Sequence, residues 1–173
     1  MLFHKLHKAA TLPTKNPGDA GYDLYALEDT LILPGERKLV STGISANLAE
    51  LIERHLWPNP CFTVVGIIKD RSGVSTKLGL HCMAGVIDRD YTGEIKVLMV
   101  NLNLGEIIAP INTVLTSYLD AAATSNRCEV RIQKGQKIAQ MVVTLAIDCL
   151  VQESETPFTN ELRGDKGFGS TGA

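Results

Sequence analysis

A chain of 173 residues is long enough for one domain with a proper core and too short for two comfortable ones. Its hydrophobic content of 45% and charged content of 21% are ordinary for a soluble globular protein. The net charge of −2 provides no broad basic surface, so a nucleic-acid polymer is not an expected partner.

The cysteines and the first residues exclude further classes. Cys61, Cys82, Cys128 and Cys149 are far apart and form no Cys-x-x-Cys pair, which argues against a zinc site and against a small disulfide scaffold. The start "MLFHKLHKAATLP" lacks the long apolar run of a signal peptide, and no later stretch is suited to span a bilayer. We therefore expect a cytoplasmic protein that is neither secreted nor bound to a membrane.

Short β-rich runs recur along the chain between Gly, Pro and Asp turn signals. Many short strands of this kind predict an antiparallel sandwich or barrel rather than a β-α-β protein. The predicted runs cover residues 30–35, 37–48, 61–69, 94–104, 128–132 and 137–151.

Two segments interrupt the β pattern. In "NLAELIERHLWPNP", Asn47 and Glu50 are suited to form the capping box of a short helix that ends at Pro58. The segment 105–127 contains Pro110 as a possible helix start. A connection this long is usually functional or a folded insert, so either a binding role or a helical flap over a sheet edge fits it.

The stretch "GVIDRDYTGE" lies between two of the β-rich runs. Gly85 and Gly93 favour a tight hairpin, from which Asp88, Asp90 and Tyr91 would project and which another molecule could approach closely. The alternative is that these residues serve turn geometry alone, because acidic turns are common.

Two more stretches carry phosphate-binding chemistry. In "DRSGVSTK", Arg71 offers a planar fork for phosphate oxygens, Ser72 a hydroxyl donor, and a turn at Gly73 exposes main-chain N–H groups. The glycine-rich tail "RGDKGFGSTG" adds the charge of Arg163 and the flat ring of Phe168, which can stack on a base. A solvated turn and a disordered end are the respective alternatives.

Five segments, in this order, resemble the trimeric dUTPase family. They are "DAGYDLYA" from Asp19, "RSGVSTK" from Arg71, "GVIDRDYTGE" from Gly85, "KGQKIAQMV" from Lys134 and the tail from Arg163. Each segment is weak alone, but five in order are specific. The resemblance covers nearly the whole chain outside the two interrupting segments.

The resemblance implies an all-β fold, a jelly-roll-like β-barrel with short helical inserts that assembles as a homotrimer. It implies a Mg²⁺-assisted enzyme that hydrolyses dUTP to dUMP and pyrophosphate, which keeps uracil out of DNA and supplies dUMP for dTMP synthesis. Each active site would be assembled from all three subunits. Residues 1–173 would form a single domain with an insert at 105–127 and a flexible C-terminal arm at about 157–173 that closes over bound nucleotide.

On the nucleoside side, Asp88 matches the family's general base, which orients and deprotonates the water that attacks the α-phosphorus. Tyr91 matches the residue that lies against deoxyribose. The groups that would read the uracil edge are Ala84, Gly85, Val86, Ile87 and Lys96.

On the phosphate side, the resemblance assigns Arg71, Ser72, Gly73 and Gln140 to the triphosphate. Asp23 matches an acid that lies near Mg²⁺ through water, and the phosphates would otherwise hold the ion. The tail would close on the substrate, with Phe168 stacking on uracil. The other tail residues, which would contact the γ-phosphate, are Arg163, Gly169, Ser170 and Thr171.

The sequence departs from the family pattern at a few positions. Asp70 stands where the family usually has proline, so its negative charge would either weaken phosphate binding or point away from the phosphates. Thr92 replaces the usual arginine after the tyrosine, Gln136 the usual acid of the fourth segment, and Lys166 a glycine of the tail. None of them removes a residue assigned to the chemistry.

Two other functions compete with dUTP hydrolysis. A dCTP deaminase is related in fold, but the Asp88 and Tyr91 pair and the full tail fit the dUTPase pattern better. A binding or regulatory protein is the second alternative, in which the insert 105–127 recruits a protein partner, as an extra segment does in some bacteriophage dUTPases. This second function is compatible with hydrolysis.

Overall fold

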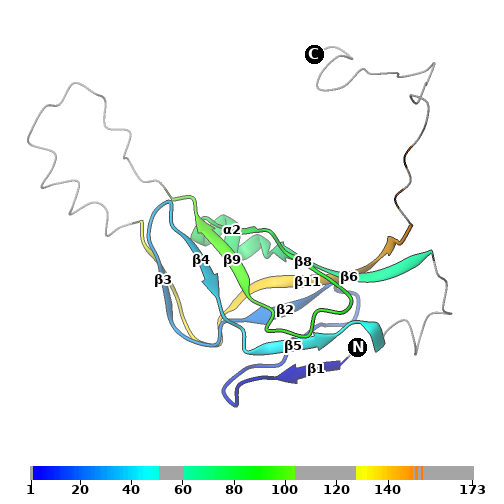
Figure 1. The fold of residues 1–173 in the computed structure, drawn as a ribbon. Helices are drawn as coiled ribbons and strands as arrows, with labels where there is room; N and C mark the ends of the chain where they lie inside the picture. The colour runs from blue at the N-terminus through cyan, green and yellow to red at the C-terminus, as the bar shows by residue number, and fades with distance from the viewer. Residues whose placement is uncertain (1, 51–60, 104–127, 150, 152, 154–173) are drawn as a thin grey trace, which may run out of the picture.

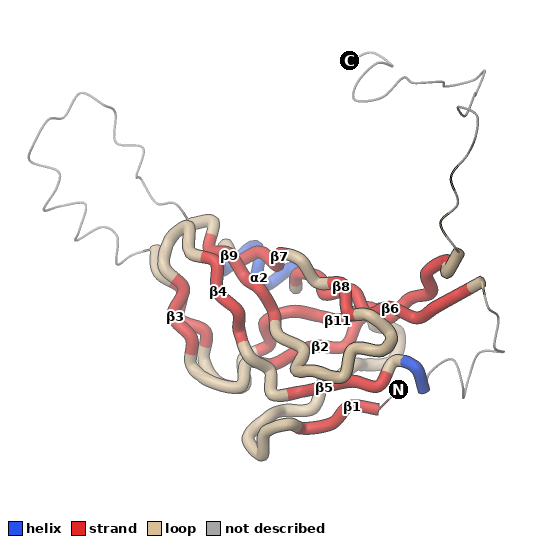
Figure 2. Tube along the Cα trace, viewed as in Figure 1, coloured by secondary structure: helices blue, strands red, loops and turns tan. Residues whose placement is uncertain are grey.

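The computed structural model describes residues 2–50, 61–103, 128–149, 151 and 153 (Figure 1). Strands dominate these residues, with a short helix between two of them (Figure 2). In chain order the elements are β1 (Leu2–Lys5), β2 (Gly21–Tyr25), β3 (Thr30–Ile32), β4 (Arg37–Val40), β5 (Ile44–Asn47), β6 (Phe62–Asp70), α2 (Ser72–Leu78), β7 (Leu80–Met83), β8 (Val86–Ile87), β9 (Val97–Asn101), β10 (Val130–Ile132) and β11 (Lys137–Ile147).

The strands form a four-stranded sheet in the order β2-β11-β6-β8 and a three-stranded sheet in the order β4-β9-β7. Two further pairs, β1 with β5 and β10 with β3, complete the arrangement. All strand pairs in the described part of the chain are antiparallel. The expectation of an antiparallel, mostly-β fold is therefore confirmed.

Each of the six predicted β-rich runs contains at least one strand. The run 37–48 divides into β4 and β5, because Gly43 turns the chain with a φ of 67°. Strands β1, β2, β7 and β8 lie outside the predicted runs. These four strands carry no extended run of β-branched residues, so pairing with neighbouring strands determines them.

The core lies between the sheets and follows the two-residue alternation of the strands. In β9, Val97 and Met99 are fully buried, and in β6, Val64 and Ile68 point to the same interior. Leu24 of β2 belongs to the same cluster. Each such side chain contributes roughly 1.5–3 kcal/mol by leaving water, so the barrel is stabilised mainly by this interior.

The prediction of a turn at Gly73 within "DRSGVSTK" was wrong, since Ser72–Leu78 forms helix α2. The helix packs beside β7 and buries Val74 in the core cluster. It ends at Gly79, whose φ is 61° and whose N–H donates to the Ser75 carbonyl at 3.0 Å. Burial of the apolar side of the helix outweighs the weak helix propensity of Gly73.

The prediction of a hairpin within "GVIDRDYTGE" was also wrong, because β8 and β9 belong to different sheets. β7 and β9 pair with each other, and the connection between them, 84–96, carries β8 across to the edge of β6. Gly66 of β6 permits this approach: a Cβ at Gly66 would lie 3.3 Å from the Cβ of Ile87. Within the connection, the Tyr91 N–H donates to the Asp88 carbonyl at 3.1 Å.

A buried asparagine, Asn101, joins several segments. Its side-chain amide donates to the carbonyls of Ile32 at 3.0 Å and Cys128 at 2.7 Å. Its side-chain oxygen accepts hydrogen bonds from the main-chain N–H and the side chain of Asn103 at 3.0 and 2.9 Å. Asn103 and Cys128 are the described residues that flank 104–127, so the residues on both sides of that segment bond to one buried side chain.

Only the beginning of the first predicted helix can be compared with the structure. The Glu50 N–H donates to the Asn47 side-chain oxygen at 3.1 Å, as a helix cap requires. The rest of that helix, the insert 105–127 and the arm 157–173 lie outside the described residues. No helix in the described part combines the length and the apolar character needed to cross a bilayer.

Candidate active site

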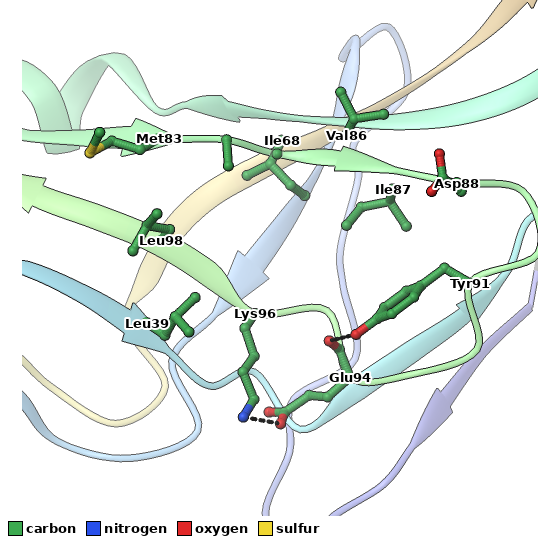
Figure 3. A pocket seen from close by; sticks show the side chains of 12 residues that line it. Leu39, Ile68, Met83, Val86, Ile87, Asp88, Tyr91, Glu94, Lys96 and Leu98 are labelled. Carbon is green, nitrogen blue, oxygen red and sulfur yellow. Dashed lines mark hydrogen bonds and ion pairs between the residues drawn. The ribbon is translucent and has the colours of Figure 1, made fainter.

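The connection 84–96 forms one wall of a cleft, here called the apolar cleft, with a volume of ≈ 370 Å³ (Figure 3). Strands β4, β6, β7 and β9 supply the rest of its lining. In Figure 3, Asp88 lies at one end of the cleft beside Val86 and Ile87, and Leu39 and Leu98 lie at the other. The residues assigned to the nucleoside from the sequence all line this cleft: Ala84, Gly85, Val86, Ile87, Asp88, Tyr91 and Lys96.

The main chain at the entrance to the connection has an unusual conformation. Ala84 has a φ of 58° and Gly85 a φ of 113°. A Cβ at Gly85 would lie 2.9 Å from the Cβ of Ile68, whose N–H donates to the Gly85 carbonyl at 2.7 Å. Only glycine fits this position, and the contact fixes the main chain of the cleft wall against β6.

Tyr91 is held in place by its own loop. Its hydroxyl donates to the Glu94 carbonyl at 2.9 Å (Figure 3). A Cβ at Gly93 would lie 2.6 Å from the Tyr91 hydroxyl, so glycine at position 93 makes room for the ring. Tyr91 is 43% exposed and lines the cleft, which leaves it accessible to a ligand.

Glu94 attaches the loop to the turn between β4 and β5. Its Oε1 accepts hydrogen bonds from the main-chain N–H groups of Thr42 at 3.1 Å and Gly43 at 2.8 Å. Its Oε2 lies 3.5 Å from Nζ of Lys96. Sequence reasoning did not assign Glu94 to the site, although it ends the quoted "GVIDRDYTGE" segment.

A second cleft, here called the polar cleft, has a volume of ≈ 500 Å³ and lies between β2, β11 and the start of α2. It contains every described residue that the sequence assigned to phosphate or to magnesium. Its lining is Asn16, Asp19, Ala20, Gly21, Asp23, Arg71, Ser72, Gly73, Lys137 and Gln140.

The carboxylate of Asp23 lies between two cations. Its Oδ1 is 2.7 Å from Nε of Arg71, and its Oδ2 is 2.7 Å from Nζ of Lys137. The hydrogen bond to Asp23 raises the pKa of Lys137 above its ordinary value, so this side chain stays charged. Lys137 stands inside the quoted "KGQKIAQMV" segment, but sequence reasoning assigned only Gln140 there.

Gln140 is fixed from both neighbouring strands. Its side-chain amide donates to the Asp70 carbonyl at 2.8 Å. In strand register it lies between Asp23 of β2 and Lys69 of β6. A Cβ at Gly21 would lie 2.8 Å from its side-chain oxygen, so glycine in β2 leaves room for this amide.

The Asp70 carboxylate points away from the polar cleft, which decides between the two alternatives left open by the sequence. Its Oδ1 accepts the Cys82 N–H at 2.6 Å, and its Oδ2 contacts Nδ1 of His81. Partial burial raises the pKa of Asp70, but the hydrogen bonds from Cys82 and the charge of His81 outweigh this and hold it below its ordinary value. The carboxylate is therefore ionised at neutral pH without facing the phosphate residues.

The donors of the polar cleft suit a hard ion that takes most of its ligands from elsewhere. Within residues 2–50, 61–103 and 128–149, no three His, Cys, Asp or Glu side chains gather into a metal site. Both oxygens of Asp23 already have cationic partners. This arrangement fits Mg²⁺ bound by phosphates and water, with Asp23 beyond its direct ligands.

Among the residues that the structure describes, the two clefts have no lining residue in common. Asp88 lies in one, and Arg71 and Gln140 lie in the other. The assigned tail residues, Arg163, Phe168, Gly169, Ser170 and Thr171, lie outside the described part of the chain. Leu39 had no signal in the sequence, because only the pairing of β4 with β9 brings it to the apolar cleft.

A family model described as dUTPase matches residues 7–113 and 121–172. The chain is 35% identical over 176 residues to the deoxyuridine 5'-triphosphate nucleotidohydrolase of Hydrogenobaculum sp., covering 99% of this chain and 97% of that protein. A solved structure of a Staphylococcus bacteriophage 80alpha dUTPase mutant with dUpNHpp has a TM-score of 0.74 and 26% identity, covering 99% of this chain and 98% of that one. A second solved structure is a mutant dUTPase of S. aureus phage phi11, which is described as revealing the coordination of a structural Mg(II) ion. It has a TM-score of 0.68 and 23% identity, and the match covers 91% of this chain and 98% of that one.

Proposed function

Since the chain belongs to the dUTPase family and is a dUTP diphosphatase, we propose that its apolar cleft holds the nucleoside of dUTP and its polar cleft the triphosphate. The observation that carries this proposal is the separation of the assigned residues. Those assigned to base and sugar line the apolar cleft, and the described ones assigned to phosphate line the polar cleft.

In the apolar cleft, main-chain groups of residues 84–87 read the uracil edge. Gly85 is fixed against Ile68, so this wall cannot retreat to admit a larger base. The thymine methyl is excluded sterically, and cytosine is refused because its amino group meets a donor. Tyr91, held by Glu94, lies against deoxyribose and leaves no room for a 2′-hydroxyl.

In the polar cleft, Arg71, Ser72, Gly73 and Gln140 bind the triphosphate. The Nε of Arg71 faces Asp23, which orients the guanidinium and leaves its outer nitrogens for phosphate oxygens. Lys137 adds a second positive charge next to Asp23. This pair of cations compensates for the carboxylate in a cleft that has to accept a highly charged anion.

Asp88 acts as the general base on the water that attacks the α-phosphorus in line with the leaving pyrophosphate. It is exposed at the end of the apolar cleft, where the nucleoside meets its phosphates. A carboxylate is a weak base at neutral pH, so most of the rate comes from positioning the water and the phosphorus.

Mg²⁺ is the cofactor we propose, held by the phosphates and water with Asp23 beyond its direct ligands. When bound, the ion neutralises phosphate charge and holds the triphosphate in one geometry for attack. Asp23 itself keeps Arg71 and Lys137 oriented toward the same region.

We further propose a homotrimer in which each active site combines the apolar cleft of one chain with the polar cleft of another and the arm of a third. This assembly is what the family resemblance implies, and it requires one dUTP to reach Asp88 of the apolar cleft and Arg71 of the polar cleft together. The single domain, the closing arm 157–173, the cytoplasmic location and a protein partner for 105–127 stay predictions.

The test is pyrophosphate release from dUTP, dTTP, dCTP and UTP, with and without Mg²⁺. We expect magnesium-dependent release from dUTP alone. Asp88→Asn should keep nucleotide binding and lose at least about a thousandfold in kcat, in the range of a lost catalytic group. Equal turnover by this variant would refute the assignment of Asp88, and ammonia released from dCTP would indicate a deaminase instead.

A further inference from the structure

Asp70 occupies the point where the chain passes from β6 to the phosphate-binding residues. It is the last residue of β6, and Arg71, Ser72 and Gly73 follow it directly. Its carboxylate is bonded to β7 through the Cys82 N–H at 2.6 Å and through the His81 ring. β7 in turn runs into Ala84, the first residue of the connection that forms the apolar cleft.

The main chain of Asp70 is fixed from the opposite side. Its carbonyl accepts the Gln140 side-chain amide at 2.8 Å, and its backbone lies opposite Ala139 of β11. Asp70 is thus bonded to β7 by its side chain and to β11 by its main chain. The position of the next residue, Arg71, is thereby determined from two strands.

The cluster of Asp70, His81 and Cys82 is not a nucleophilic site of its own. Burial raises the pKa of the Cys82 thiol to about 12, with a further contribution from Asp70, so the thiol stays protonated. The role left for the Asp70 carboxylate is to hold β6 to β7.

We propose that Asp70 is a positioning residue for triphosphate binding. By holding β7 with its carboxylate, it fixes the junction of β6 and α2 at which Arg71, Ser72 and Gly73 line the polar cleft. A proline, usual at this position in the family, restricts the main chain by its ring. In this chain, the hydrogen bonds between the Asp70 carboxylate and β7 restrict the main chain instead. The proposal rests on the proposed function, in which the polar cleft holds the triphosphate.

The test uses Asp70→Ala and Asp70→Asn in the full chain. Glu129→Ala is the matched control: it also removes a carboxylate paired with a cation, Arg131 at 2.6 Å, and lies outside both clefts. We measure KM and kcat for dUTP, and the inhibition constants of pyrophosphate and of deoxyuridine, which probe the polar and apolar clefts separately.

For Asp70→Ala we expect both KM for dUTP and the inhibition constant of pyrophosphate to rise about tenfold. The value of kcat should stay within about twofold, and the inhibition constant of deoxyuridine should not change. Asp70→Asn keeps an acceptor for the Cys82 N–H, so we expect KM for dUTP and the inhibition constant of pyrophosphate to rise only about threefold in this variant. The control should match the unmodified chain.

The proposal is overturned if the inhibition constant of pyrophosphate stays at the value of the control variant. It is also overturned if the inhibition constant of deoxyuridine rises equally, because an equal rise indicates a general loosening of the fold. Thermal melting identifies a variant that fails to fold, in which case Asp70→Asn carries the test. If the unmodified chain neither cleaves dUTP nor binds either probe, the proposed function itself is wrong.

Discussion

Two glycines of the candidate site are glycine for different physical reasons. Gly85 has a φ of 113°, and a Cβ there would lie 2.9 Å from Ile68, so the fold itself requires it. A Cβ built at Gly73 has no atom of the described residues within 4 Å. The packing of this part of the chain gives no reason for glycine at position 73, which fits a position reserved for close approach of a ligand.

Gly73→Ala should therefore separate stability from binding. Alanine in the first turn of α2 gains up to about 1 kcal/mol of helix propensity, so the melting temperature should rise or stay the same. The added methyl group should raise KM for dUTP about tenfold, or about 1.4 kcal/mol, because the phosphates lose their close approach to the main chain. Melting curves and steady-state kinetics check both parts. A lower melting temperature with unchanged KM would contradict the assignment.

The hydrogen-bonded carboxylate of Asp70 predicts a dependence of stability on pH. The pKa of this carboxyl lies below its ordinary value of 3.8, so the folded state favours the ionised form. The stabilisation that Asp70 contributes is complete well above pH 3.8 and is lost as the pH falls through the folded-state pKa. The gap in melting temperature between the unmodified chain and Asp70→Asn should be full at about pH 5 and shrink below about pH 4. A gap that is the same at about pH 3 and about pH 5 would argue against this prediction.

At the scale of elements, the strands that stand in β-rich runs could be predicted and the others could not. β6, β9 and β11 carry runs of apolar and β-branched residues that the sequence displays directly. β2 and β8 carry too few such residues, and their existence depends on pairing with β11 and β6. Helix α2 was missed because burial of Val74, which the sequence does not reveal, outweighs Gly73.

The same reasoning applies to the candidate site. Asp88, Arg71 and Gln140 stand in recognisable segments, and the structure brings them to two clefts. Leu39 reaches the apolar cleft, and His81 reaches Asp70, only through strand pairing and a side-chain contact. Contacts of this kind join residues that are distant in the chain or have no motif, so a single sequence does not predict them.

Asn101 permits a prediction about how the sheets are joined. Asn101→Ala leaves the buried carbonyls of Ile32 and Cys128 without their donor, which should cost about 2–4 kcal/mol of unfolding free energy. Asn103→Ala is the matched control, because Asn103 is only partly buried and its amide donates to the Leu78 carbonyl and to Asn101. Urea unfolding measures the free energy of unfolding of both variants. An equal loss of unfolding free energy in the two variants would contradict the central role of Asn101.

At the scale of the whole molecule, the separation of the clefts makes shared active sites testable by mixing subunits. Asp88→Asn and Arg71→Gln should each be nearly inactive alone. In a homotrimer assembled at random from equal amounts of both, about a quarter of the sites would combine an intact Asp88 with an intact Arg71 from another chain. Co-expression of the two variants and assay of dUTP cleavage should show this recovery. If the mixture is no more active than its components, both residues of one site belong to one chain.

The attachment of Asn103 and Cys128 to Asn101 also bears on how this protein can diverge. The barrel holds Asn103 and Cys128, the described residues on either side of 104–127, through the buried Asn101 side chain. Doubling the length of a connecting loop costs in general only about 0.6 kcal/mol of closure entropy, so insertions between two such fixed points have little effect on folding. Related chains can therefore acquire, exchange or lose sequences at this position while the residues of both clefts remain under separate selection.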